Sequence, residues 1–92
     1  MELYLVAYDI PNDRRRQRVA NWLQDYGQRV QFSVFEVWLP QGEREPFLHK
    51  LERLIDAEKD SVRLYYLCKA CQARVLTLGQ GQAPQPPGPV II

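Results

Sequence analysis

The chain has 92 residues, enough for one domain near the lower limit of independent folding. A hydrophobic content of 46%, with two Trp, five Tyr and three Phe, excludes a disordered chain. The net charge of +1 excludes a global basic field, so contact with nucleic acid would need a local cluster. No stretch has the length of a membrane span and no secretory signal begins the chain. A cytoplasmic protein with reduced cysteines is therefore expected.

The first part of the chain predicts a strand followed by a helix. Residues 3–8, LYLVAY, form a continuous apolar run that ends at Asp9. Asn12 is a good N-cap and Asp13 suits the first turn, so a helix is expected to start there. Its apolar stripe consists of Val19, Trp22, Leu23 and Tyr26. Gly27 is predicted to end the helix in a left-handed conformation.

The middle of the chain predicts a second strand region and a second helix. Residues 29–39, RVQFSVFEVWL, are rich in β-branched and aromatic residues but are long for one strand. A bend or tight turn at Ser33 would split them into two strands. Pro46 fits the first position of a helix after the loop PQGERE. The apolar face of that helix consists of Phe47, Leu48, Leu51, Leu54 and Ile55.

The C-terminal part predicts two more strands and a tail. Residues 61–68, SVRLYYLC, and 73–78, ARVLTL, both have strand character, with a short turn between them. Residues 80–92 form a Gly/Gln/Pro-rich tail that ends in the apolar sequence PVII. We expect PVII to pair as a short strand on a sheet edge of another protomer or of a partner protein. The domain itself would then span residues 1–79.

This order predicts an α+β fold, a ferredoxin-like βαββαβ sandwich with an extra C-terminal strand. Two helices of this size cover only one face of a sheet. A second copy of the chain is the simplest cover for the other face, so a symmetric homodimer is expected.

Asp9 has two interpretations. A carboxylate at a strand end is commonly a turn residue bonded to nearby backbone N–H groups. Alternatively it is a Mg²⁺ ligand, because Mg²⁺ takes one or two protein carboxylates and fills its shell with waters and substrate phosphate. One aspartate per chain is too few for a dedicated site, whereas two brought together by a dimer axis are enough.

Four arginines, Arg14, Arg15, Arg16 and Arg18, lie near the predicted helix start, where the helix dipole favours negative charge. They form either a solvated face or a phosphate-binding cluster, for which guanidinium groups are well suited. On a helical wheel Arg15 and Arg16 lie near the apolar stripe, whereas Arg14 and Arg18 point away. We therefore expect Arg15 and Arg16 to extend toward the turn that carries Asp9.

Other chemically capable residues give weaker signals. His49 lies opposite the apolar stripe of the second helix and is expected in solvent. Cys68 and Cys71 form a CxxC, but zinc needs four ligands and the chain has no second pair. A redox pair typically begins a helix in a thioredoxin-like context, which is absent. Both are interpreted as structural thiols.

The sequence resembles the CRISPR-associated Cas2 family over residues 1 to about 79. The similarity rests on YDIPNDRRRQRVANWLQDYG, RVQFSVFE, DSVRLYYLCKAC and VLTLG. It implies a ferredoxin-like homodimer that acts in CRISPR adaptation as a metal-dependent endonuclease on RNA or DNA. It also implies a scaffold role, in which the dimer bridges two dimers of the Cas1 integrase and holds double-stranded DNA.

By position, the resemblance makes Asp9 the Mg²⁺-binding aspartate, paired with its mate across the dimer. It places residues that affect cleavage at Tyr8, Arg16, Arg18, Arg29 and Phe35. The sequence departs from the family pattern in VWLPQ after the SVFE block and in the tail.

Two functions therefore compete: a Mg²⁺-dependent endonuclease at Asp9, and a non-catalytic scaffold whose arginines contact double-stranded DNA without sequence preference. Single-stranded RNA is a further possible ligand. A ferredoxin-like RNA-binding or regulatory module is a third alternative, although the strands carry no RNP-like aromatic motif.

Overall fold

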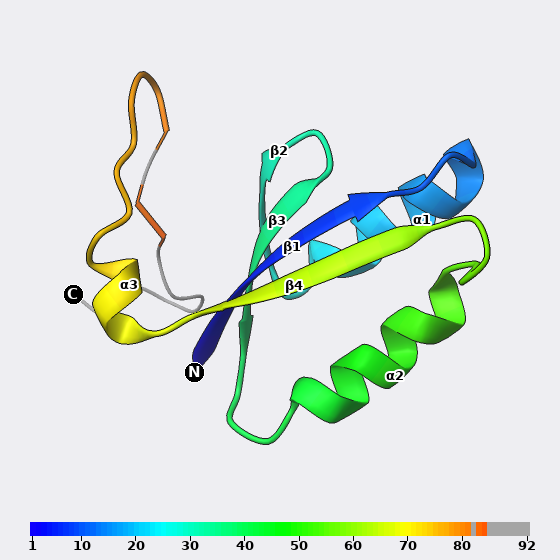
Figure 1. Cartoon of the computed structure of the whole chain (residues 1–92), viewed down its shortest axis with the longest axis horizontal. Helices are drawn as coiled ribbons and strands as arrows, with labels where there is room; N and C mark the ends of the chain where they lie inside the picture. Colours follow the sequence, from blue (N-terminus) through cyan, green and yellow to red (C-terminus); the bar gives the residue numbers. More distant parts are fainter. Residues whose placement is uncertain (82, 85–92) are drawn as a thin grey trace.

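The computed structural model describes residues 1–81 and 83–84. Its elements are β1 (Glu2–Asp9), α1 (Asp13–Leu23), β2 (Gly27–Gln31), β3 (Val34–Leu39), α2 (Arg44–Leu54), β4 (Ser61–Leu67) and α3 (Lys69–Gln72). The strands form one antiparallel sheet in the order β2-β3-β1-β4 (Figure 1). The first six elements have the predicted βαββαβ order, and the sheet order is that of a ferredoxin-like fold.

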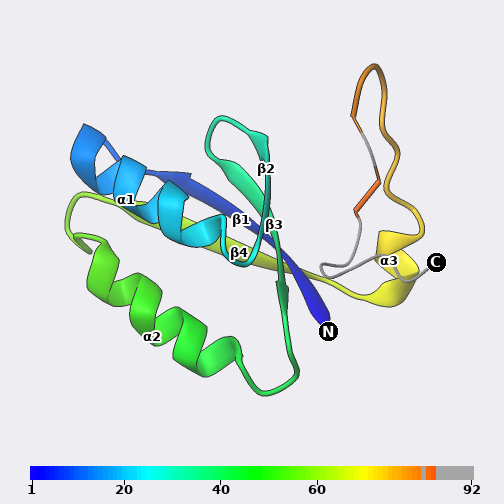
Figure 2. The same ribbon diagram turned by 180° about the vertical axis from the view of Figure 1, so that it is seen from behind.

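The helices α1 and α2 lie on the same face of the sheet, as the view from behind shows (Figure 2). Alternate residues of β1 and β3 point toward them and form the core. The buried strand residues on this face are Tyr4, Val6, Tyr8, Phe35, Val37 and Leu39. From the helices, Trp22 stacks on Phe47 with ring centroids 4.7 Å apart. The apolar stripes of the two helices therefore pack against the buried face of the strands and form one apolar layer.

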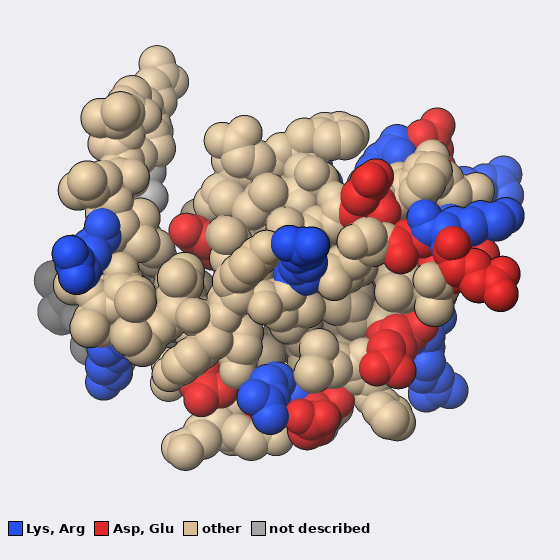
Figure 3. Space-filling view, viewed as in Figure 1, with Lys and Arg blue, Asp and Glu red and all other residues tan. Residues whose placement is uncertain are grey.

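The opposite face of the sheet is not covered by any helix of the described residues (Figure 1). Leu5 and Ala7 lie on this face and are half-buried. Leu5 pairs with Glu36 on one side and with Tyr65 on the other. Seen from this side, the surface over the sheet is largely uncharged apart from one basic group at its middle (Figure 3). The predicted open face is therefore present.

Two local signals in the sequence are confirmed. Asn12 caps α1, and its side-chain Oδ1 accepts a hydrogen bond from the backbone N–H of Arg15 at 2.8 Å. Phe32 and Ser33 form the turn between β2 and β3, as the expected break at Ser33 requires.

The role predicted for Gly27 is wrong. α1 already ends at Leu23, and Gly27 is the first residue of β2. A Cβ atom on Gly27 would lie 1.8 Å from the backbone oxygen of Glu36. The glycine therefore permits a close approach of β2 to β3 rather than a left-handed helix end.

The second helix begins earlier than expected, at Arg44 instead of Pro46. Pro46 still lies in the first turn, where a backbone N–H has no partner within the helix. The turn predicted after β4 contains the short helix α3, and Gln72 reinforces it by donating from its side chain to the Leu67 carbonyl at 2.8 Å.

The strand predicted over residues 73–78 is wrong for the single chain. Residues 75–78 have no regular structure, and Leu76 and Leu78 are 90% and 95% exposed. This segment does not join the sheet (Figure 1) but lies across a hollow from the edge strand β2, so its β-prone residues remain unpaired in the single chain. The PVII end of the predicted tail lies outside the described residues. No helix of residues 1–81 and 83–84 combines the length and apolar character that crossing a membrane requires.

Candidate functional site

The candidate site is a hollow of about 340 Å³ at the end of β1. Three chain segments meet there: the end of β1 with the turn after it, the start of α1, and the β2–β3 turn. The lining residues are Tyr8, Asp9, Ile10, Pro11, Arg16, Phe32 and Ser33. The backbone N–H of Tyr8 donates to the carbonyl of Ser33 at 3.0 Å, which fixes the β2–β3 turn against the end of β1. Acidic and basic side chains gather at the end of the molecule where α1 begins (Figure 3).

Asp9 is exposed, whereas its neighbours Tyr8 and Ile10 are buried. The strand alternation directs Tyr8 toward the helices and Asp9 away from them. Among residues 1–81 and 83–84, the Asp9 carboxylate makes no hydrogen bond and no ion pair. The structure thus does not support the interpretation of Asp9 as a turn residue bonded to nearby N–H groups. Its oxygen lone pairs remain available to a ligand.

Arg16 lines the same hollow as Asp9 and is fixed by its own contacts. Its Nη1 donates to the carbonyl of Ile10 at 2.9 Å, and its Nη2 forms an ion pair with Asp13. Its guanidinium carbon lies 5.6 Å from the centroid of the Phe32 ring, within the range of a cation–π contact. The side chain is 27% exposed, so part of the positive group still faces solvent at the hollow.

Arg15 does not extend toward Asp9, contrary to the expectation from the helical wheel. Its guanidinium forms a two-point ion pair with Asp60, in which Nη2 and Oδ1 are 2.8 Å apart. The Asp60 side chain is fully buried and also accepts from the backbone N–H of Asp56 at 2.8 Å. The Arg15 guanidinium holds the pKa of the Asp60 carboxyl below its usual value. This pair links α1 to the segment that leads into β4.

Tyr8 lines the hollow, whereas Phe35 and Arg29 do not. The rings of Tyr8 and Phe35 stack with centroids 6.3 Å apart, and both side chains are buried. The guanidinium carbon of Arg29 lies 5.3 Å from the Phe35 ring. Arg18 is exposed on α1 and does not line the hollow. The structure therefore brings Asp9, Arg16 and Tyr8 together at the hollow, and connects Phe35 and Arg29 to it only through the ring of Tyr8.

Sequence reasoning missed Phe32. Its ring lines the hollow and is 70% exposed, which is unusual for so large an apolar side chain. The available signal was a phenylalanine immediately before Ser33, at the position where the strand was expected to break.

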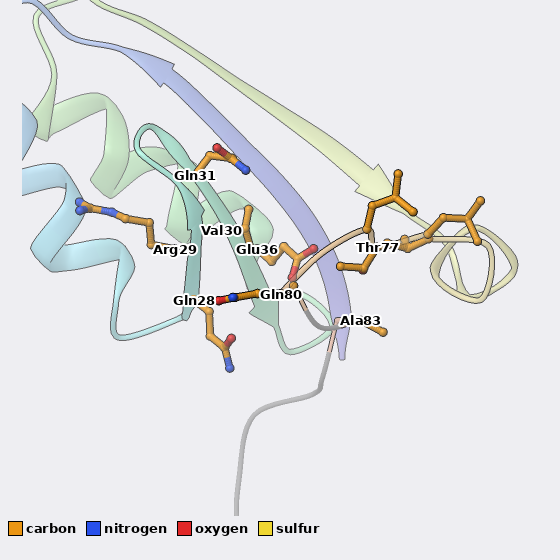
Figure 4. A pocket seen from close by; sticks show the side chains of 12 residues that line it. Gln28, Arg29, Val30, Gln31, Glu36, Thr77, Gln80 and Ala83 are labelled. Carbon is orange, nitrogen blue, oxygen red and sulfur yellow. The ribbon is translucent and has the colours of Figure 1, made fainter.

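A larger hollow, of about 630 Å³, lies elsewhere. It is formed between β2 and residues 75–81 and 83 (Figure 4). Gln28, Gln31, Thr77 and Gln80 give it a mainly amide and hydroxyl lining, and Arg29 points away from the segment. Partial burial raises the pKa of the Glu36 carboxyl there. With this single carboxylate the hollow carries no constellation for catalysis.

The cysteines differ from expectation in one respect. Cys68 caps the start of α3, although no helix was predicted there. Hydrogen bonds from the backbone N–H and the thiol of Cys71 lower the pKa of Cys68. Residues 1–81 and 83–84 contain no group of three side chains suited to hold a metal ion, so a zinc site is not formed by this part of the chain. His49 is exposed, as predicted.

Comparison with known proteins gives a consistent result. Residues 1–75 match the family model described as CRISPR associated protein Cas2. A Synechocystis protein named CRISPR-associated endoribonuclease Cas2 3 is 42% identical over 92 residues, covering 100% of both chains. The crystal structure of Streptococcus pyogenes Cas2 has a TM-score of 0.73 at 43% identity, covering 84% of this chain and 99% of that one.

A chain from a partial Cas6-RT-Cas1–Cas2 complex superimposes with a TM-score of 0.72 at 32% identity, covering 85% of this chain and 91% of that one. The match of the family model over most of the chain, and the identity over its full length, agree with the ferredoxin-like fold. The chain belongs to the CRISPR-associated Cas2 family.

Proposed function

We propose that this protein is a Mg²⁺-dependent endonuclease that cleaves phosphodiester bonds of RNA, DNA or both. The observation that carries the proposal is the exposed Asp9 carboxylate, without a partner among residues 1–81 and 83–84, in a hollow that Arg16 also lines. A free carboxylate beside a cation suits a ligand that combines metal and phosphate. Relatives named endoribonuclease and endonuclease support this reaction class.

The residues present fit a magnesium ion. Mg²⁺ prefers oxygen ligands, keeps several waters and needs only one or two carboxylates when phosphate completes its shell. Asp9 is the residue that would hold it, because its carboxylate is exposed at the hollow. When bound, the ion would activate water and neutralise charge on the phosphate. Arg16 is positioned to bind a phosphate oxygen with the part of its guanidinium that faces solvent.

We also propose that the active form is a symmetric homodimer. One carboxylate per chain is a weak metal site, and a two-fold axis would supply a second Asp9. The sheet face that no helix covers is available for this interface. Leu5 and Ala7 of the central strand β1 are half-buried there. Covering these side chains would remove apolar area from water, which is the main driving force of association.

The test is a cleavage assay on labelled RNA and duplex DNA over a Mg²⁺ titration, comparing wild type with Asp9→Asn. Loss of the metal ligand should reduce cleavage by about 100-fold or more, because metal assistance is worth several kcal/mol. Sedimentation should give the same dimer for both proteins. Asp25→Asn is the matched control, since Asp25 is also exposed but does not line the hollow. Equal cleavage by wild type and Asp9→Asn would eliminate the proposed metal-dependent cleavage at Asp9.

A second function has a specific observation in its favour. The similarity to a chain of a Cas1–Cas2 complex supports a scaffold that holds double-stranded DNA for the Cas1 integrase. Arg14 and Arg18 are exposed on α1 and suit contacts to the phosphate backbone, which carry no sequence information. Under this function Asp9→Asn would leave DNA binding and association with Cas1 unchanged, so the same variant separates the two proposals.

A further inference from the structure

The β2–β3 turn presents Phe32 to solvent at the rim of the Asp9 hollow. Its side chain is 70% exposed, whereas the aromatic residues beneath it, Tyr8 and Phe35, are almost fully buried. A ring that stays exposed contributes little burial free energy to folding, and a polar residue would suit the turn equally well. Phe32 therefore needs an explanation other than the stability of the turn.

The ring is positioned by contacts around it. The backbone of the turn is tied to β1 through Tyr8, whose N–H donates to the carbonyl of Ser33 at 3.0 Å. The Tyr8 hydroxyl lies 3.5 Å from the Phe32 carbonyl. The Arg16 guanidinium, itself anchored on the Ile10 carbonyl at 2.9 Å, lies over the ring. A ring held in this way loses little conformational freedom when a ligand binds.

The space beside the ring suits one nucleotide. Phe32 and Asp9 line the same hollow, whose volume of about 340 Å³ is at the small end of ligand sites. One wall is an aromatic ring, and the rest carries a carboxylate and a guanidinium. This combination matches a nucleobase joined to a phosphate, since the base stacks on an aromatic side chain while the phosphate binds positive charge.

We infer that Phe32 stacks on an unpaired nucleobase adjacent to the phosphodiester at Asp9. A base in a duplex is covered on both sides and must be unstacked before it can lie on a protein ring. The contact therefore favours single-stranded or frayed nucleic acid over duplex. The inference builds on the proposed reaction at Asp9, but the stacking contact itself needs neither metal nor cleavage.

The test measures binding in the Asp9→Asn background without Mg²⁺, so that cleavage cannot affect the result. The probes are a single-stranded oligonucleotide carrying 2-aminopurine and a duplex of the same sequence. Phe32→Ala and Phe32→Leu should weaken single-strand binding by about 5- to 150-fold, the range for loss of one stacked base. Phe32→Trp should retain it. Duplex affinity should not change in any variant.

Quenching of 2-aminopurine provides the direct signature of stacking. It should occur with Phe32 and with Phe32→Trp, and disappear with Phe32→Ala and Phe32→Leu. Tyr66→Leu is the matched control, because Tyr66 is 56% exposed but pairs with Tyr4, at the opposite end of β1 from Asp9.

Three results would overturn the inference. Equal losses for single strand and duplex would show that Phe32 acts only by holding Arg16. Unquenched 2-aminopurine with Phe32 present would show that no base stacks there. A dimer that dissociates when Phe32 is changed to Ala would assign the ring to contact with a second copy. If Asp9→Asn cleaved as well as wild type, the proposed nuclease would be wrong, but these binding measurements would remain valid. The two proposals can therefore fail independently.

Discussion

Two carboxylates that lie near the first turn of α1, Asp9 and Asp60, have opposite environments. Asp60 is fully buried and receives N–H groups from both Arg15 and the Asp56 backbone. Asp9 is exposed and receives none among residues 1–81 and 83–84. A buried charge destabilises the fold unless it is paired, whereas an exposed charge is solvated by water and stays free to bind a ligand.

The difference shows how one arginine run is divided between structure and function. Successive residues on a helix point about 100° apart, so Arg15 and Arg16 project toward different neighbours. Arg15 reaches the segment before β4, and Arg16 reaches the turn after β1. The ion pair of Arg15 with Asp60 therefore fixes the first turn of α1. The neighbouring Arg16 is thereby held in position at the Asp9 hollow.

The largest effect on this comparison should come from Asp60→Asn. Removing the carboxylate leaves the Arg15 guanidinium and the backbone N–H of Asp56 without their acceptor, so the melting temperature should fall by several degrees. Asp9→Asn, measured in the same calorimeter, should change stability by less than about 0.5 kcal/mol. Equal changes for the two variants would remove the distinction between the carboxylates.

Low pH should reduce the stabilisation that the ion pair of Asp60 with Arg15 provides. Arg15 lowers the pKa of Asp60 in the folded protein, so folding favours the ionised carboxyl. The stabilisation is complete above the unfolded pKa of about 3.9 and is lost as the pH falls below it toward the lower folded value. Urea unfolding between pH 6 and pH 3 should show this loss in wild type. Asp60→Asn should show a flatter dependence on pH, and an identical dependence would contradict the assignment.

The smallest effect should come from Arg18→Ala. Arg18 is exposed and makes no contact with the Asp9 hollow, so stability should change by less than about 0.5 kcal/mol. If Arg18 contacts a phosphate, the slope of log affinity against log salt should fall by roughly one unit. Arg53→Ala, an exposed arginine on α2, serves as the control. A salt slope unaffected by loss of Arg18 would assign this side chain to a solvated face.

Much of the fold could be predicted because it follows from local patterns. The apolar run of β1, the Asn12 cap and the break at Ser33 each depend on residues within one element or turn. Asp9 and Arg16 could also be predicted to lie close together, because the strand and helix that carry them are joined by a short turn.

The remaining features depend on contacts between distant segments. Asp60 lies 45 positions from Arg15, so a helical wheel cannot reveal that pair. The segment of residues 73–78 has strand-forming residues, but in the single chain it faces the edge strand β2 across a hollow and does not pair with it, and propensity alone cannot reveal that. Phe32 was overlooked because hydrophobicity predicts burial, whereas its exposure depends on how the turn projects past Tyr8.

Gly27 has a practical consequence for any mutant library of this protein. The space for its missing side chain is occupied by backbone atoms of Glu36 and Val37, which cannot rotate aside as a side chain would. Every other amino acid at this position would push the two strands of the β2–β3 hairpin apart at their base, five residues before Phe32 at its tip. Codon 27 should therefore be kept fixed when the hairpin is randomised, so that selection reports on the tip rather than on loss of the hairpin.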